Sequence, residues 1–145
     1  MKLRIITPER LVFEEDIDQV TLPTQEGEIT VLPHHIPLVS IIQPGEIFIK
    51  KGKQDIPLAV SGGMLQVRPD EIIVLADSAE RVEEIIEERA EQARVRALAM
   101  LEEKRHDSTQ YAQLAAKIEK ETARLRVARK HRKQHIYPTQ SQSEK

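Results

Sequence analysis

The chain divides into two halves that differ in how apolar and polar residues alternate. From Met1 to Glu80, apolar residues occur in short runs or at every second position, and Pro or Gly interrupts them every few residues. This pattern is typical of short β-strands joined by tight turns, and it predicts a β-sandwich or barrel. The expected strands are Leu3–Thr7, Leu11–Phe13, Ile17–Leu22, Glu28–Leu32, Pro37–Ile42, Glu46–Lys50, Ile56–Ser61, Met64–Arg68 and Ile72–Ala76.

From Asp77 onward the apolar residues recur at every third or fourth position, which is the period of a helix. We expect a first helix of about twenty-five residues, because no Gly or Pro interrupts this period. It begins at Asp77, because this carboxylate can accept hydrogen bonds from the free amides of a helix start. The predicted packing stripe consists of Val82, Ile85, Ile86, Arg89, Ala93, Ala97, Met100 and Leu101.

A second helix is predicted from about Thr109 to Gln134, after a polar break at residues 106–109. Its apolar residues form one narrow stripe, which fits a single neighbouring helix and therefore an antiparallel hairpin. Arg129 occupies the stripe position after Leu125, so we expect the last turns to be loosely held. The predicted stripe consists of Tyr111, Leu114, Ala115, Ile118, Thr122 and Leu125.

The predicted fold is α+β: an all-β sandwich over residues 1–80, a helical hairpin over residues 81–135 and a disordered tail over residues 136–145. The first 80 residues carry seven Lys and Arg against thirteen Asp and Glu, and the remainder carries fifteen against eleven. A basic hairpin therefore follows an acidic sandwich. No apolar run of about 20 residues occurs, so any association with a membrane is expected to pass through partner proteins.

We find no pattern that predicts catalysis, a metal ion or a cofactor. Cysteine is absent, and the adjacent His34 and His35 lack the spacing that holds a metal rigidly. The segment Lys50–Lys53 lacks the Gly-Lys-Ser/Thr sequence of a phosphate-binding loop. Ser61 is followed by two glycines and another strand, whereas a nucleophilic serine elbow leads into a helix.

The most unusual segment is Leu114–Lys133, which holds eight Lys and Arg against two Glu. Its basic side chains have three physical interpretations. They can be a solvated helix end, because cations suit the negative end of the helix dipole. They can contact the phosphates of a nucleic acid or another polyanion. They can also dock on an acidic surface of a partner protein. The residues alone leave these alternatives open.

Several segments in order resemble the epsilon subunit of the bacterial F-type ATP synthase, which is called delta in mitochondria. The similarity covers about residues 2–133 and rests on ITPERLVFEEDIDQVTLPTQEGEITVLPHHIPLV, QPGEI, VSGGMLQV, IIVLADSAE, EERAEQA and ARLRVAR. The resemblance implies a non-catalytic subunit of the rotating central stalk, on the cytoplasmic face of the inner membrane. It implies four kinds of partner, namely the gamma subunit, the polar loops of the c-ring, and the alpha and beta subunits of the catalytic head, and no nucleic acid.

Particular residues match positions that have a role in the family. By this resemblance Glu28 and His35, with Glu26 nearby, would contact the loops of the c-ring. His34 stands where the family commonly has Gly, which leaves the local backbone conformation open. The strand around Ser61–Leu65 would support the gamma interface.

In the family the hairpin restrains ATP hydrolysis by placing basic residues against an acidic loop of the beta subunit. The residues that match are Arg124, Arg126, Arg129 and Lys130. Some relatives bind ATP through an Ile/Leu-Asp-x-x-Arg-Ala motif, of which Arg89 and Ala90 are present here. Ile86 replaces its Asp, so the resemblance gives Arg89 no carboxylate partner and no ATP site is expected.

Overall fold

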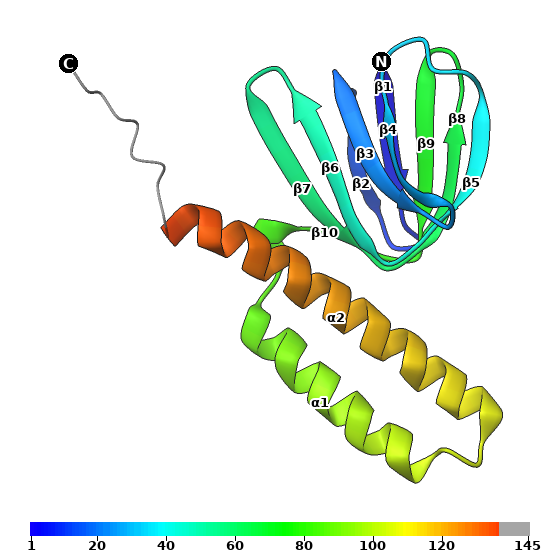
Figure 1. Cartoon of the computed structure of the whole chain (residues 1–145), viewed down its shortest axis with the longest axis vertical. Coiled ribbons are helices and arrows are strands. Elements are labelled where there is room, and N and C mark those ends of the chain that lie inside the picture. Colours follow the sequence, from blue (N-terminus) through cyan, green and yellow to red (C-terminus); the bar gives the residue numbers. More distant parts are fainter. Residues whose placement is uncertain (137–145) are drawn as a thin grey trace.

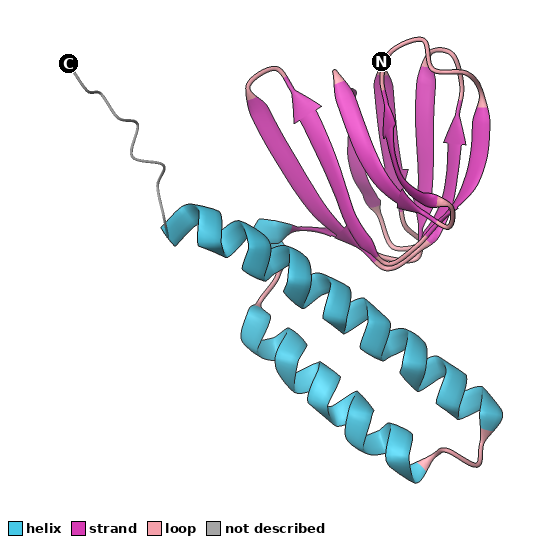
Figure 2. Ribbon diagram, viewed as in Figure 1, coloured by secondary structure: helices cyan, strands magenta, loops and turns pink. Residues whose placement is uncertain are grey.

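The structure, a computed structural model, describes residues 1–136 of the chain, and side chains as far as Arg132. All nine expected strands are present, and a tenth short strand follows them (Figures 1 and 2). The strands are β1 (Lys2–Ile6), β2 (Leu11–Asp16), β3 (Gln19–Thr24), β4 (Gly27–Val31), β5 (Leu38–Ile42), β6 (Gly45–Lys51), β7 (Gln54–Val60), β8 (Gly63–Val67), β9 (Glu71–Ala76) and β10 (Ala79–Arg81).

The strands form two layers that share one apolar interior. One layer runs in the order β10-β7-β6-β3, with β4 paired to β3, and the other in the order β5-β8-β9-β1-β2. A single residue pair, Thr24 with Ile42, joins β3 to β5 at the corner. All pairings are antiparallel except that of β1 with β9, which is parallel. The expected sandwich is therefore confirmed.

Alternation along the strands builds the core. Leu3 and Ile5 on β1 are fully buried, as are Ile47 and Ile49 on β6, while their neighbours in sequence face outward or are half-buried. This period of two is what one buried sheet face requires. Gly63 marks a point where two strands come unusually close. A β-carbon added there would lie 2.8 Å from the Cα of Ala76.

The chain after β9 does not enter a helix at Asp77, so this prediction was wrong. The amide of Asp77 donates to the carbonyl of Gly62, and Ala79–Arg81 pairs with β7 as strand β10. A short 3₁₀ turn, η1 (Val82–Glu84), follows. The α1 helix begins only at Glu87 and ends at Glu103. Pairing with the edge of β7 satisfies the backbone polar groups of residues 79–81, which a helix would otherwise have satisfied.

The hairpin consists of α1 and of α2 (Ser108–Ile136), which lie antiparallel. Asp107 caps the N-terminus of α2, because its Oδ1 accepts from the amides of Thr109 and Gln110, each at 3.1 Å. In Figure 1, α2 lies between α1 and the sandwich, so it is the helix that attaches the hairpin. The expected tail lies outside the described residues, except for Ile136, which ends α2. No helix in the described part is long and apolar enough to span a membrane.

Candidate protein-interaction surfaces

The C-terminal half of α2 packs on the sandwich through a small apolar cluster. Val127 and Ala128 are buried against Ala59 of β7 and Ile85, with Val82 at the edge. The prediction that these turns are loosely held was therefore wrong. The sequence stripe described the face toward α1, whereas Val127 and Ala128 lie on a second face of the same helix, which covers the sandwich. Two of the four buried residues are alanines, so this cluster is small.

An ion pair flanks this cluster on one side. Arg124 of α2 donates through Nε and Nη2 to Oε2 of Glu80, at 3.1 and 2.9 Å, and through Nη1 to Glu121, at 2.7 Å. The side chain of Arg124 is 20% exposed and that of Glu121 only 6% exposed. Because Glu80 belongs to β10, this pair connects α2 to the sandwich. Charge-assisted hydrogen bonds of this length and burial are stronger than ordinary surface pairs.

A second charged cluster lies one α2 turn beyond the apolar residues. Glu46 of β6 accepts from Nζ of Lys130 at 3.3 Å and lies 3.2 Å from Nε2 of His131. The imidazole of His131 stacks on Phe48, with ring centroids 6.3 Å apart and planes inclined by 14°. His131 is buried, whereas Lys130 extends to the surface. Glu46 thus binds two consecutive basic residues of the helix.

The opposite face of α2 forms ion pairs with α1. Arg129 lies 3.4 Å from Glu91, and Arg132 lies 2.9 Å from Glu87. Hydrogen bonds from Arg94, supplemented by Arg129, lower the pKa of the Glu91 carboxyl. These pairs are more exposed than those that face the sandwich, since Arg129 is 51% and Arg132 54% exposed.

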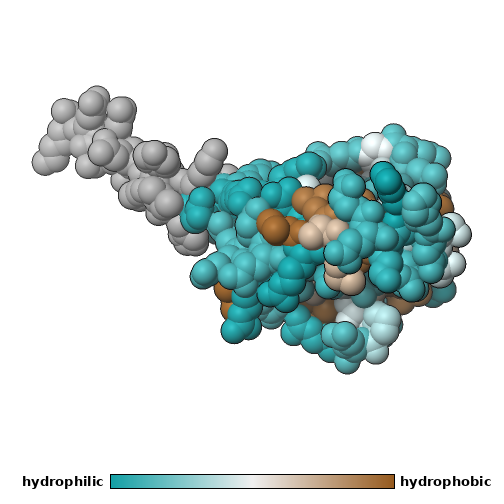
Figure 3. Space-filling model, turned by 90° about the horizontal axis from the view of Figure 1, so that it is seen from below, coloured by the Kyte–Doolittle hydropathy of each residue, from teal (hydrophilic) through white to brown (hydrophobic). Residues whose placement is uncertain are grey.

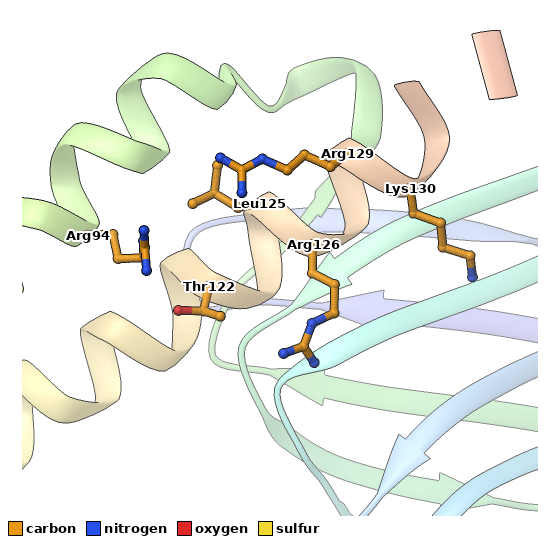
Figure 4. A pocket seen from close by; sticks show the side chains of 6 residues that line it. All are labelled: Arg94, Thr122, Leu125, Arg126, Arg129 and Lys130. Carbon is orange, nitrogen blue, oxygen red and sulfur yellow. The ribbon is translucent and has the colours of Figure 1, made fainter. Parts of the chain in front are cut away.

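Three of the four sequence-predicted basic residues, together with Arg94, line a groove of about 540 Å³ beside α2, whose floor includes Leu125. Figure 4 shows that Lys130 points toward the strands, whereas Arg129 reaches back above Leu125. Sequence reasoning missed Arg94, because nothing in the apolar period of α1 marks it as facing α2. Arg126 forms no ion pair with another described side chain. Arg124 is the predicted residue that lies outside this groove.

The three residues expected to contact the c-ring occupy both ends of β4. Glu26 is exposed at the turn between β3 and β4, Glu28 is exposed near the start of β4, and His35 follows the far end of β4, in the loop to β5. The structure therefore does not bring all three together. His34 has a positive φ of 69°, the left-handed conformation that glycine adopts most easily. The glycine that the family commonly has at position 34 would adopt this backbone conformation without strain.

The sandwich also exposes a row of apolar side chains across five neighbouring strands, on the outer face of the second layer. Register pairs Ile41 with Met64, Met64 with Leu75, Leu75 with Ile6, and Ile6 with Leu11. Ile6 is half-buried and the other four are at least half exposed. We call these five residues the outer row. A contiguous exposed apolar patch of this kind marks a protein interface more often than chance.

The sequence analysis placed Ile86 in the packing stripe of the first helix, and this prediction was wrong. Ile86 precedes the helix and is half exposed, while Ala90 and Ala97 form the buried stripe. Arg89 is exposed on the first turn of α1. The side chain of Ile86 offers no hydrogen-bond acceptor. Among the described residues, no group of three or more His, Asp or Glu could hold a metal ion.

Seen from the hairpin side, the surface is mostly hydrophilic, with small hydrophobic areas (Figure 3). An acidic β-sandwich with an apolar outer row, carrying a basic hairpin attached by few apolar contacts, defines a protein-binding subunit of a larger assembly. The sequence model of a protein family, the β-sandwich domain of the ATP synthase delta/epsilon chain, matches residues 1–82. The chain belongs to this family of ATP synthase delta and epsilon subunits.

Relatives match far beyond the sandwich. An ATP synthase epsilon chain of Dehalococcoides mccartyi is 47% identical over 133 residues, which is 92% of this chain and 95% of the relative. The epsilon chain of Chloroflexus aggregans is 44% identical over 90% of this chain and 93% of the relative. That of Halalkalibacterium halodurans is 38% identical over 88% and 96%. The similarity therefore includes the hairpin.

Solved structures share the fold. A chain in the cryo-EM structure of the Euglena gracilis mitochondrial ATP synthase, in an assembly that includes the c-ring, superposes with a TM-score of 0.68. It is 24% identical and covers 81% of this chain and 74% of its own. A chain of the Tetrahymena thermophila central stalk and c-ring gives a TM-score of 0.51 at 14% identity, over 57% and 67%.

Proposed function

We propose that this protein is a non-catalytic rotor subunit in the central stalk of an F-type ATP synthase, coupling ion flow through the c-ring to ATP synthesis. The similarity to ATP synthase epsilon chains over nine-tenths of the sequence carries this proposal. In this role the protein lies peripherally on the cytoplasmic face of the inner membrane and is held there by its partners.

The gamma subunit is the proposed partner of the outer row. Met64 lies at the centre of the row and within the strand that the family resemblance associates with gamma. Burial of five apolar side chains would supply the non-directional part of the binding free energy, at roughly 25 cal/mol for each Å² removed from water. The hairpin attaches at β6, β7 and β10, in the other layer, so it leaves this face accessible.

Co-expression with the gamma subunit tests this assignment. We expect the full chain to co-purify with gamma, and Met64→Glu to reduce recovery at least tenfold, because a charge buried in an apolar interface is strongly unfavourable. Gln113→Glu, on an exposed position of α2, is the matched control and should bind normally. Equal recovery of both variants would contradict the assignment, and no complex with the unmodified chain would contradict the rotor role itself.

The exposed Glu26 and Glu28, with the half-buried His35, are the proposed contacts with the polar loops of the c-ring. They lie around β4, which extends from the sandwich layer that pairs β3 with β6. Because Glu26 and Glu28 are separated from His35 by the length of β4, we propose two contact points rather than one. Replacing Glu28 by Gln and His35 by Ala should lower coupling between proton or sodium flow and ATP synthesis in reconstituted vesicles, while binding to gamma is retained.

The hairpin is the proposed brake on ATP hydrolysis. Its basic residues Arg124, Arg126, Arg129 and Lys130 would meet an acidic loop of the beta subunit, close to the alpha subunit, when the hairpin leaves the sandwich. Because the apolar cluster at Val127 and Ala128 is small, separating the hairpin from the sandwich loses little hydrophobic free energy. A chain that ends after Arg81 keeps all ten strands, so it should assemble normally and raise ATPase activity of the reconstituted head. Unchanged activity would contradict the brake and leave the rotor role intact.

A further inference from the structure

A cleft of about 520 Å³ lies where the C-terminal part of α2 meets the sandwich. Three parts of the chain surround it, namely strands β6 and β7, the linker of residues 82–86 before α1, and α2 itself (Figure 1). We call it the linker cleft. Ligand-binding cavities in proteins have volumes of roughly 300 to 1,000 Å³. The linker cleft therefore has the size of a small-molecule site.

The cleft exists because α2 covers only part of β7. Ala59, Pro57 and Asp55 occupy alternate positions on this strand, so their side chains point to the same face of the sheet. Ala59 is buried in the apolar cluster with Val127 and Ala128, Pro57 is half-buried and Asp55 is exposed. The cover that the helix provides thus ends along this strand, which leaves space above Pro57.

Much of the lining is apolar. It consists of Phe48, Pro57, Val82, Ile85 and Ala128. Phe48 and Pro57 are paired in register on neighbouring strands, so they form one continuous wall. The imidazole of His131 stacks on Phe48 and lies 3.2 Å from Glu46, which holds the wall in place. An aromatic ring or apolar chain in this space would be removed from water, and this favours its binding.

The polar part of the lining is acidic. Asp55 of β7, Glu83 of η1 and Glu87 of α1 contribute three carboxylates. Arg132 lies 2.9 Å from Glu87 and neutralises it. Asp55 and Glu83 form no ion pair with any side chain in the described part of the chain. Two uncompensated carboxylates beside an apolar wall attract a cation.

We propose that the linker cleft binds a small organic cation that carries its charge on an aromatic or other apolar body. The body would lie against Phe48 and Pro57, and the cationic group would lie near Asp55 and Glu83. A metal ion is not the expected cation, because among residues 1–132 no group of three His, Asp or Glu could hold one. A nucleotide does not fit either, since the carboxylates repel its phosphates.

The walls of the cleft come from the sandwich, the linker and α2, so a bound ligand contacts all three at once. Such a ligand stabilises the arrangement to which it binds. Any effect of the ligand on ATP hydrolysis rests on the proposed brake, whereas the binding itself does not.

Four small molecules separate the contributions of charge and ring. Benzamidine has an aromatic ring and a cationic amidinium, benzamide is its neutral counterpart, benzoate is the anion, and acetamidine has the cation without the ring. Titration of the full isotope-labelled chain, followed by backbone amide shifts, measures each affinity. We expect benzamidine to bind with a dissociation constant of about 1 mM and to shift the amides of Phe48, Val82 and Ala128. Benzamide and acetamidine should each bind about tenfold more weakly, and benzoate should not bind.

Neutralising the two unpaired carboxylates is the decisive comparison. Asp55→Asn with Glu83→Gln should weaken the binding of benzamidine about tenfold and leave that of benzamide unchanged, because only the cation interacts with these charges. Asp16→Asn with Glu102→Gln removes the same charge from exposed positions outside the cleft. This control variant should bind benzamidine normally.

Equal affinity of the unmodified chain for benzamidine and benzamide would overturn the proposal without the use of any variant. Equal weakening by both double variants would also overturn it, as would amide shifts confined to other surfaces. These measurements involve neither gamma nor ATP hydrolysis. A negative result would therefore refute the cation site and leave the proposed rotor role intact.

Discussion

Arg124 and Glu80 join the two parts of the molecule through a single carboxylate oxygen. Nε and Nη2 of Arg124 lie 3.1 and 2.9 Å from Oε2 of Glu80, although the two residues are 44 positions apart in sequence. The third guanidinium nitrogen donates to Glu121 of the same helix. The planar fork of an arginine allows this geometry, which a lysine ammonium cannot reproduce.

We therefore expect Arg124→Lys to destabilise the docked hairpin, with Arg124→Leu more severe because Glu121 would be left nearly buried without a partner. The expected loss in the free energy of unfolding is about 0.5 to 1 kcal/mol for lysine and about 2 kcal/mol for leucine, allowing for the partial exposure of the pair. Urea denaturation measures both. Arg126→Leu is the control, and an equal loss there would indicate that the Arg124 contacts contribute nothing specific.

The second prediction concerns acid. A hydrogen bond from Arg10 lowers the pKa of the Glu84 carboxyl in the folded protein, and Arg10 lies 2.8 Å from it. A carboxyl with a lowered folded pKa stabilises the protein above its unfolded pKa of about 4.3, and this contribution disappears as pH falls through the folded pKa. Glu84→Gln should thus be less stable than the unmodified protein at pH 7 and equally stable near pH 3.

Thermal unfolding across this pH range, with both proteins in the same buffers, gives the comparison. Glu83→Gln, one residue earlier, removes an exposed carboxylate that has no ion pair with a described residue, and its stability difference should not vary with pH. A difference for Glu84→Gln that persists unchanged at pH 3 would show that the carboxylate charge is not the cause.

The third prediction concerns the loop after β4. His34 holds a left-handed backbone conformation at φ 69°. Glycine adopts this conformation without the β-carbon clash, so His34→Gly should increase the free energy of unfolding by about 0.5 kcal/mol, while a β-branched His34→Val should lower it by about 1 kcal/mol or more. Guanidinium titration distinguishes the three proteins. Greater stability of the valine variant than of the glycine variant would contradict the assigned backbone conformation.

The fourth prediction concerns packing between β8 and β9. A β-carbon at Gly63 would meet backbone atoms of Leu75 and Ala76, and its φ of 149° is itself strained for other residues. Gly63→Ala should lower the free energy of unfolding by about 3 kcal/mol, because backbone on both sides must shift. Gly52 also has a positive φ, but nothing lies within 4 Å of its added β-carbon. Gly52→Ala should therefore cost only about 1 kcal/mol.

Periodicity predicted the sandwich and hairpin because both depend on local alternation, which the sequence contains. It missed β10, since Ala79–Arg81 is too short to show a period and is a strand only because β7 offers an edge. It placed the start of α1 ten residues early for the same reason. An Asp followed by helix-forming residues is a valid start signal, but the tertiary pairing of residues 79–81 overrides it.

The site was less predictable than the fold. The family resemblance supplied Arg124, Arg126, Arg129 and Lys130, yet the partners of three of them are glutamates far away in sequence. No sequence pattern relates Glu46 to Lys130. The docking face of α2 was missed because Val127 and Ala128 alternate with arginines, so its short apolar stretch does not form a continuous stripe.

The parallel pairing of β1 with β9 also sets the order in which the protein can form during synthesis. Strand β1 lies between β2 and β9. It is synthesised first, but this layer of the sandwich can form completely only after β9 has been synthesised. Such distant pairing slows closure, whereas a hairpin of local contacts forms quickly. On a ribosome the helices emerge after all the strands. The α2 helix can therefore pair with the glutamates of the sandwich only after the last strands of the sheet have been synthesised.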